Sequence, residues 1–532
     1  MWEPCLLTLR IGAMFSVPLA LRRPVSFVRS VSRCATVGLV AAAACVYDAR
    51  IPSQPAGAAT AARAPQLAAV ARGGAATNNR HVVSFSGSVP SDFAAQVAAL
   101  GGKVLWVSSA SGLAAVSGLQ GSAAATLAGR RGIQGVDADA LIPLDVPLVA
   151  TEATADAGGV QSNANPAAAV RYPRQWNMRA VQADVAWAHG FLGSSSVSIF
   201  MLDSGIDPHH ADTEGRVDPT RSVDLLGTFD AQLPDGSTVP FTEADTVQKY
   251  FPGKEVYTDL FFHGTHTAAT VSSNAVRAAG ITSMTTLVAV KVCGYINDCP
   301  FSSILNGVIY AANSGADVVN MSLGGAFTKA GNGRFVGLLD KVFNFARSKG
   351  VTVVVSAGNS AADLDHDGNT YWTFCNTPSV ICVAATGPTS DANAGTRNGP
   401  WTDVDAPAYY TNFGRSAISV AAPGGNSSFG PPLTPPATRD VFVWAACSQT
   451  SRLTQLLGCS AAPVFIVGAQ GTSMAAPHVT GTAALLVSIV GRNPSQIKAR
   501  IQQSADNVAG NGTTPFYGKG RLNVARAVGA IP

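Results

Sequence analysis

Short apolar runs alternate with helical patterns from about residue 176 to the end of the chain. Such alternation indicates parallel strands joined by crossover helices, so we predict an α/β fold with a doubly wound, mostly parallel sheet. Ligand chemistry in such a sheet lies at the carboxyl ends of the strands. The strand candidates are residues 197–202, 287–292, 318–321, 351–356, 380–384 and 417–421.

A smaller region with its own pattern covers residues 80–146. Strand-like and helix-like runs follow one another there in the order strand, helix, strand, strand, helix, strand. This order predicts a compact, ferredoxin-like α+β unit. The strand candidates are residues 81–85, 103–107, 112–116 and 135–143, and the helix candidates are residues 92–100 and 123–128.

Two stretches of low complexity separate these regions. Residues 46–79 are rich in Ala, Gly, Pro and Gln, which is typical of a linker. Residues 147–174 include a second such stretch, which we expect to be an exposed joint open to proteolysis. We therefore place the large domain at residues 175–532.

The first 45 residues have the layout of a secretory signal. An apolar run at residues 35–46 is preceded by Arg22, Arg23, Arg29 and Arg33, and small residues follow it. We therefore expect a secreted, extracellular protein. Cys45 follows three alanines, which leaves lipoprotein anchoring through Cys45 open beside a plain, cleaved signal.

The cysteines beyond this segment lie in three close pairs. An even number of cysteines in an exported chain indicates disulfides, and pairing between neighbours is our hypothesis. A zinc site is the weaker alternative, because no pair has the two-residue spacing of a zinc knuckle. The six residues are Cys293, Cys299, Cys375, Cys382, Cys447 and Cys459.

Composition narrows the class of protein. Of the 532 residues, 47% are hydrophobic and 13% are charged, which favours a globular protein of more than one unit. The formal net charge of +4 gives no support to a nucleic-acid partner. We expect a monomer that does not bind nucleic acid.

Three motifs occur where the chemistry of such a sheet is expected. An apolar strand ends at Asp203, and His263 begins a run of small residues in Phe-Phe-His-Gly-Thr-His. Ser473 opens a helical run in Gly-Thr-Ser-Met-Ala-Ala-Pro-His, where backbone N–H groups favour developing negative charge. Each motif alone has a simpler interpretation: an aspartate in a turn, a histidine pair for a metal, or an N-cap serine. Together they have the chain order Asp, His, Ser of a nucleophilic triad.

These motifs resemble the three active-site signatures of the subtilisin-like serine peptidases, or subtilases. The resemblance extends from about residue 176 to residue 528. It implies an endopeptidase in which Ser473 attacks the peptide bond, His263 accepts its proton and Asp203 orients the imidazole. It also implies that Asn359 donates to the oxyanion. The segments expected to bind the substrate backbone and its side-chain pocket are Ser322, Leu323, Gly324 and Gly325, with Ala357 and Gly358.

The same resemblance gives the small unit a role and suggests a metal. Residues 80–146 look like the inhibitory propeptide of such enzymes, so we expect the chain to bind its own propeptide and to cleave itself between about residues 146 and 173. No cofactor is required for catalysis, and structural calcium is the metal that the family suggests. Asp212 matches one family ligand, and Asp365, Asp367 and Asn369 cluster oxygen donors around a turn glycine.

Rival functions remain at this stage. A catalytically inactive binding module on the same fold is one, although all four functional side chains are present. A zinc peptidase that uses His263 and His266 is another, although their spacing lacks the intervening glutamate of zinc proteases. Serine-carboxyl peptidases share Gly-Thr-Ser, but the His-Gly-Thr-His string argues against them.

Overall fold

The computed structural model describes most of the chain beyond residue 79. The predicted signal segment 1–45, with Cys45, and the linker 46–79 lie outside the described residues. The described ranges are 80–144, 148–152, 165–232, 238–295, 298–330, 333–372, 374–391, 401–426, 441–451 and 465–532.

A sheet of seven parallel strands forms the centre of the large domain, in the order β20-β17-β15-β13-β7-β11-β8. All six strands predicted from the sequence are present, so the doubly wound α/β prediction is confirmed. Their residues are buried on both faces, which explains the continuous apolar runs. The bounds are β7 Ser198–Asp203, β8 Val223–Asp224, β11 Thr286–Lys291, β13 Val318–Met321, β15 Thr352–Ser356, β17 Ile381–Thr386 and β20 Val420–Pro423.

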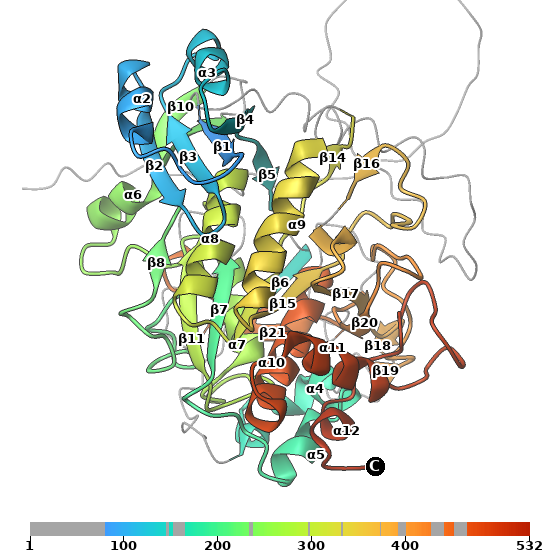
Figure 1. Ribbon diagram of the computed structural model, residues 1–532. Coiled ribbons are helices and arrows are strands. Elements are labelled where there is room, and N and C mark those ends of the chain that lie inside the picture. Colours follow the sequence, from blue (N-terminus) through green and yellow to red (C-terminus); the bar gives the residue numbers. More distant parts are fainter. Residues whose placement is uncertain are drawn as a thin grey trace, which may run out of the picture. The chain divides into compact units, whose positions relative to one another are not determined.

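Helices cover both faces of this sheet (Figure 1). Successive residues of a strand point to opposite faces, so Phe200 packs with α8 and α9, whereas Met201 packs with α10. Helix α10 is long and apolar enough to cross a membrane, yet most of it is buried, as in a core helix. The bounds are α4 Trp176–Ala180, α5 Ala183–Ala188, α7 His263–Val271, α8 Phe301–Asn313, α9 Gly333–Ser348, α10 Thr472–Val490, α11 Pro494–Gln503 and α12 Val524–Val528.

The small unit has the predicted ferredoxin-like arrangement. Its four strands are antiparallel in the order β2-β3-β1-β4, and two helices pack on them around a core of their own that includes Phe85 and Phe93. The bounds are β1 His81–Phe85, α2 Phe93–Ala99, β2 Lys103–Ser108, β3 Leu113–Ser117, α3 Gly121–Ala128 and β4 Ile133–Ala138.

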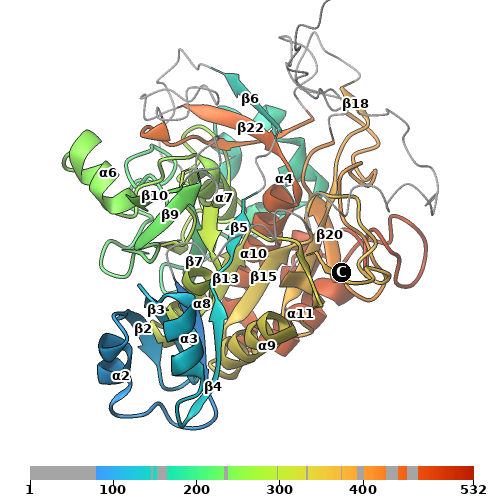
Figure 2. The same cartoon turned by 90° about the horizontal axis from the view of Figure 1, so that it is seen from above.

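Two short antiparallel pairings connect the segment after this unit to the large domain. Strand β5 (Leu141–Pro143) pairs with β12 (Asp298–Pro300). Strand β6 (Leu148–Glu152) pairs with β22 (Ile466–Gln470), which itself pairs with β21 (Val443–Ala446), and Figure 2 shows β6 beside β22. The structure thus has a strand where we expected only linker, because the partner that orders it lies more than 300 residues away.

The large domain also contains shorter strands and helices outside the central sheet. A hairpin and the helix after it place Glu243 next to Lys291, and the two side chains form a fully buried ion pair at 2.5 Å. Burial is the main cause of a raised pKa for the Glu243 carboxyl. The remaining bounds are β9 Thr228–Gln232, β10 Thr238–Thr242, α6 Glu243–Tyr250, β14 Phe327–Thr328, β16 Thr370–Tyr371, β18 Ser390–Asp391, β19 Trp401–Thr402, η2 Pro166–Ala168, η3 Tyr172–Arg174 and η4 Phe374–Asn376.

The cysteines pair with their neighbours where the structure describes both partners. Cys293 is bonded to Cys299, and Cys375 to Cys382, as the spacing predicted. Cys447 is also disulfide-bonded, but Cys459, its predicted partner, lies outside the described residues.

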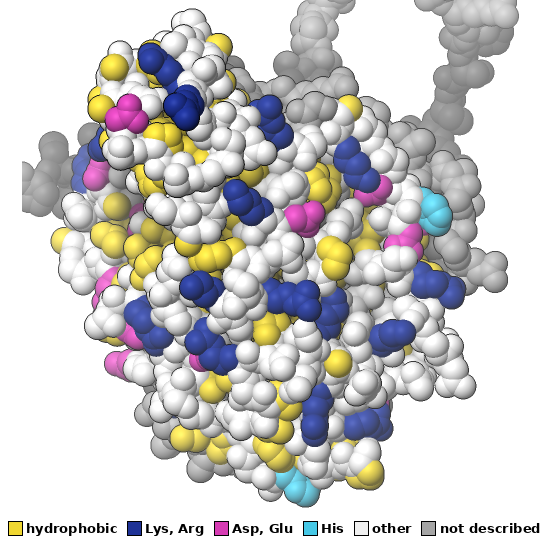
Figure 3. Space-filling model, in the orientation of Figure 1, with side chains coloured by type: hydrophobic (Ala, Val, Ile, Leu, Met, Phe, Trp, Pro, Cys, Tyr) yellow, Lys and Arg dark blue, Asp and Glu magenta, His cyan; other side chains and the backbone are white. Residues whose placement is uncertain are grey.

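Lysine and arginine side chains on the face seen in Figure 3 are dispersed among polar and apolar atoms.

Candidate active site

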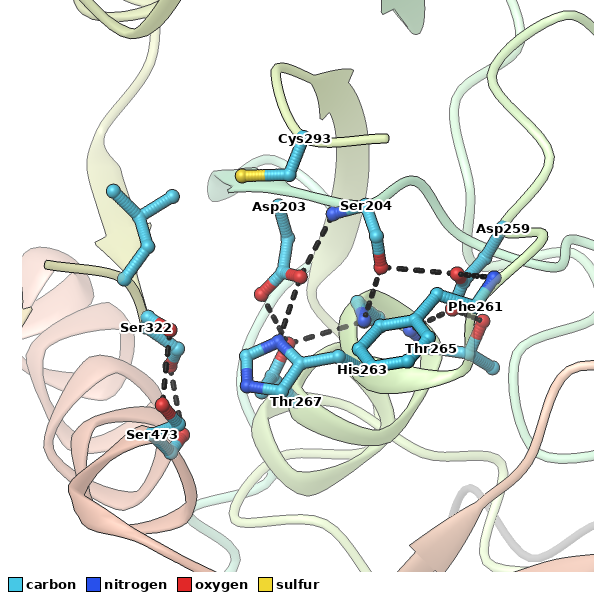
Figure 4. Close-up of polar contacts among 12 residues, drawn as sticks. Asp203, Ser204, Asp259, Phe261, His263, Thr265, Thr267, Cys293, Ser322 and Ser473 are labelled. Carbon is cyan, nitrogen blue, oxygen red and sulfur yellow. Dashed lines mark hydrogen bonds and ion pairs between the residues drawn. The ribbon is translucent and has the colours of Figure 1, made fainter. Parts of the chain in front are cut away.

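Asp203 is the last residue of β7 and is fully buried. Its Oδ1 accepts hydrogen bonds from His263 Nδ1 and from the Ser204 backbone N–H, each at 2.7 Å, and its Oδ2 accepts one from the Thr267 hydroxyl at 3.2 Å (Figure 4). Since a carboxylate only accepts, Nδ1 of His263 carries the hydrogen. The basic nitrogen of the neutral ring is therefore Nε2, and the ring extends from Asp203 toward Ser473 (Figure 4).

A second buried carboxylate holds the backbone around His263. Asp259 accepts from the Thr265 N–H at 2.9 Å and from the Thr265 hydroxyl at 2.7 Å, and also from Ser204 Oγ and the Phe261 N–H at 2.9 Å each. Burial raises the pKa of Asp259 to about 6, and the nearby charge of Asp203 adds to the rise. Our sequence analysis missed this residue. The available signal was an aspartate four positions before the histidine in an apolar string.

Gly264 allows the start of α7 to approach the turn that follows β7. A Cβ atom on Gly264 would lie 2.0 Å from the carbonyl oxygen of Gly205, which is much closer than any real contact. The start of α7 therefore packs directly on the turn after β7. This backbone contact brings His263 to Asp203.

Ser473 is the second residue of α10, and its hydroxyl points to Ser322 rather than to His263. The hydroxyl donates to the Ser322 carbonyl at 3.0 Å, and the Ser322 hydroxyl donates to the Ser473 carbonyl at 2.7 Å (Figure 4). A hydroxyl has one hydrogen to donate. Ser473 must therefore rotate its side chain before it can give that hydrogen to His263.

Asn359 is oriented by the first residue of α10. Its Oδ1 accepts from the Thr472 backbone N–H at 2.8 Å and from the Thr472 hydroxyl at 2.9 Å. The Thr472 hydroxyl in turn accepts from the Gly358 N–H at 2.9 Å. Because the amide oxygen is engaged, the NH₂ group is directed away from Thr472. Sequence reasoning also missed Thr472.

A pocket joins most of the predicted substrate-binding residues to Ser473. None of the described residues that line it is charged. Ala357 is the exception among the predicted residues: it is buried beside the pocket, where its N–H donates to Val383 and its carbonyl accepts from Asn412. The lining residues are Leu144, Ser322, Leu323, Gly324, Gly325, Ala326, Ser356, Gly358, Asn359, Ser360, Trp372, Thr472 and Ser473.

The predicted calcium ligands are not brought together. Both carboxylate oxygens of Asp212 accept backbone N–H groups from residues 276–278 at 2.8–3.0 Å. Asp365 accepts from the backbone of residues 416 and 417, Asp367 pairs with Lys329, and Asn369 accepts from the Ala330 N–H. Among the described residues no group of three or more His, Cys, Asp and Glu could hold a metal ion.

The two histidines of the His-Gly-Thr-His string have different partners. His266 Nε2 lies 3.0 Å from the Val443 carbonyl, whereas His263 is bonded to Asp203. Burial lowers the pKa of His266 to about 3. The ring is therefore neutral near pH 7 and serves as a structural hydrogen-bonding group. The separate partners of the two rings, rather than this pKa, argue against a zinc site formed by the pair.

Comparison with known proteins identifies the family. A model of the subtilase family matches residues 194–520, which is more than half of the chain. The chain belongs to the subtilase family. This subtilase is 30% identical to thermitase of Thermoactinomyces vulgaris over 67% of its own length and 96% of that protein. It is therefore a serine endopeptidase by family, and the resemblance seen in the sequence is confirmed.

Solved structures agree with this fold. The epidermin leader peptide processing serine protease of Staphylococcus aureus superimposes with a TM-score of 0.59 at 18% identity, covering 84% of this subtilase and 97% of that chain. Fervidolysin of Fervidobacterium pennivorans, a keratinolytic enzyme, superimposes with a TM-score of 0.58 at 21% identity, covering 85% of this subtilase and 61% of that chain.

Proposed function

We propose that this subtilase is a secreted endopeptidase, made as a proenzyme that cleaves itself. Ser473 is the nucleophile, His263 the general base and acid, and Asp203 the group that orients the imidazole and stabilises its cation. Asn359 and the Ser473 N–H form the oxyanion hole. The hydrogen bonds at Asp203 and Asn359 support these assignments because they orient the imidazole through Nδ1 and the Asn359 amide through Oδ1.

The reaction begins when the substrate backbone binds along residues 322–325. Rotation of the Ser473 hydroxyl from Ser322 to His263 Nε2 lets the imidazole take its proton while the oxygen attacks the carbonyl carbon. The tetrahedral oxyanion receives hydrogen bonds from Asn359 and the Ser473 N–H. His263 then protonates the leaving amine, and water hydrolyses the acyl-enzyme through the same base.

The single observation that supports self-processing is that the described residues on both sides of the interval 145–147 lie at or beside the site. Strand β5 ends at Pro143, and Leu144 lines the same pocket as Ser473. Strand β6 begins at Leu148 and pairs with β22, which runs into Gly471 and the catalytic helix. The bond to be cut therefore belongs between Leu144 and Leu148. This interval narrows the region expected from the sequence and moves it to the beginning of that region.

Contacts between the segment of residues 80–146 and the large domain support an inhibitory role for the small unit. Ile142 lies against Gly325, since a Cβ atom on that glycine would be 2.3 Å from Ile142 Cγ2. Arg80 and Asp139 form a buried ion pair that also bonds to the large domain. As long as these contacts persist after cleavage, the unit covers the residues to which a substrate must bind.

The proposal extends to export and assembly. The signal-like segment and the disulfides support an oxidising, extracellular location. Anchoring through Cys45 stays a prediction, as do the monomeric state and a bound calcium. Polypeptides are the substrates, and none of the steps requires a cofactor.

The test compares the native chain from residue 46 with its Ser473→Ala variant by intact mass, amino-terminal sequencing and casein hydrolysis. The native chain is expected to yield a fragment that begins between residues 145 and 148 and to cleave casein, whereas Ser473→Ala stays whole and inactive. Ser360→Ala is the matched control, because Ser360 lines the pocket but has no proposed chemical role. Processing by Ser473→Ala would refute the nucleophile, and an inert but folded native chain would favour the binding-module alternative.

A further inference from the structure

Strand β22 comes directly before the catalytic serine in the chain, and both of its edges are paired. One edge pairs with β21, and the other pairs with β6 over five residues, from Gln470 opposite Leu148 to Ile466 opposite Glu152. Only Gly471 and Thr472 separate β22 from Ser473. The ladder between β22 and β6 therefore begins three residues before the nucleophile.

Strand β6 follows the proposed cut. Glu152 is the fifth residue after a cut behind Pro147 and the eighth after a cut behind Leu144. Because Leu144 lines the pocket of Ser473 and the proposed cut lies before β6, β6 corresponds to the part of a substrate that leaves with the new amino terminus. The structure thus contains, in its own chain, an example of a bound leaving segment.

The β22 edge is suited to binding backbone rather than particular side chains. All five of its residues are buried, from Ile466 to Gln470, so their side chains are packed inside the protein. What this edge offers to a partner is the row of N–H and C=O groups that an edge strand presents. Extended peptides bind such edges by adding a strand, with main-chain hydrogen bonds supplying the affinity.

We propose that the β22 edge is an extended binding site for substrate residues beyond the cleaved bond, reaching at least to the fifth of them. The inference rests on the proposed function, because the mature enzyme must first release β6 from this edge. The ligand class is an extended polypeptide with free backbone N–H groups in this stretch. Flexible segments of long chains are therefore preferred over short peptides, and proline is disfavoured at alternate positions.

A length series tests the reach of this site. Mature enzyme is assayed with peptides that share one acyl side and carry one to ten residues after the cleaved bond. The specificity constant kcat/KM is expected to rise at least tenfold as the leaving side of the peptide is lengthened from two residues to the end of the ladder. The ladder ends opposite Ile466, which corresponds to the fifth to eighth residue depending on the position of the cut. A rise that stops at the second residue overturns the inference, and so does retention of residues 148–152 on β22 after maturation. If no peptide of any length is cleaved, the proposed function itself fails.

A backbone scan separates a strand ladder from ordinary length effects. In an antiparallel pair, only every second residue donates its N–H to a given neighbour. N-methylation at successive residues of the longest peptide is therefore expected to lower kcat/KM about tenfold at alternate positions and little between them. Methylation beyond the eighth residue is the control. Equal effects at all positions, or none, overturn the inference, and because only the substrate is altered, misfolding of the enzyme cannot imitate either result.

Discussion

Replacing Asp139 with asparagine is expected to lower the affinity of the cleaved small unit for the enzyme about a hundredfold. Asp139 lies after β4 and is 2% exposed. It accepts from the Ser302 N–H at 2.8 Å, at the first turn of α8, and from the Ser302 hydroxyl. Its other partner is Arg80, at 3.2 Å, which also donates to the Leu226 carbonyl at 2.9 Å and to the Ser302 hydroxyl at 2.6 Å.

The magnitude follows from the burial of Arg80. In the separated unit Arg80 is free to be hydrated, whereas in the complex both charges are almost fully buried. The asparagine side chain would still accept from the Ser302 N–H, but docking would bury the guanidinium without its anion. Removing one partner of a buried pair costs about 3–5 kcal/mol, and the lower end applies because one acceptor remains. Since about 1.4 kcal/mol is tenfold in an equilibrium constant, roughly 3 kcal/mol corresponds to about a hundredfold.

The assay follows the delay between self-cleavage, seen on a denaturing gel, and the start of casein hydrolysis. In D139N this delay is expected to shorten by about the same factor, and the cleaved fragment to separate from the enzyme on gel filtration. D92N is the matched control, since Asp92 is exposed at the start of α2 and its carboxylate accepts from Gln96 of the same unit rather than from the large domain. A delay unchanged in a variant that melts like the native protein would refute the reasoning.

Three further predictions concern the site and its surroundings. Asn359→Ala should lower kcat by about 10²–10³ with little change in KM, because one oxyanion donor is lost, and a fall in kcat below tenfold would remove Asn359 from the oxyanion hole. Gly264→Ala should abolish peptidase activity and lower the unfolding temperature, since its methyl group would overlap a carbonyl oxygen, and native activity would contradict this. Burial lowers the pKa of His266 to about 3 and of His478 to about 4, and it raises that of Asp259 to about 6. Between pH 6 and 4 the unfolded chain therefore carries about two histidine protons that the folded chain lacks, while the folded chain carries one at Asp259 that the unfolded chain lacks. These groups should therefore lower the free energy of unfolding by about 1.4 kcal/mol for each pH unit of acidification. Urea titrations of the Ser473→Ala chain measure this change, and a free energy of unfolding that rises on acidification would refute the prediction.

Local patterns were enough to predict the strands and the order of the motifs. Residues 318–321 and 351–356 are buried on both faces, so their apolar runs are unbroken. Asp203 ends such a strand, whereas His263 and Ser473 lie at the start of buried helices. The pairing of β6 with β22 left no local signal, because an edge pairing depends on a partner far along the chain. The orientation of the Ser473 hydroxyl toward Ser322 also could not be predicted from the sequence. The acidic turn at residues 363–369 suggested calcium by composition alone, and the folded chain gives its oxygens separate partners.

The covalent link between β5 and β6 has a kinetic consequence for the proposed self-cleavage. While the chain is whole, Leu144 at the pocket and Leu148 on β22 belong to the same molecule, so the first cut depends on neither dilution nor a second molecule. After the cut, each side must bind by its own contacts, without the effective concentration that the covalent link supplied. Rebinding then competes with every other polypeptide in solution. Under the proposed function, maturation is therefore a unimolecular event followed by a concentration-dependent one, and dilution alone is expected to favour the active enzyme.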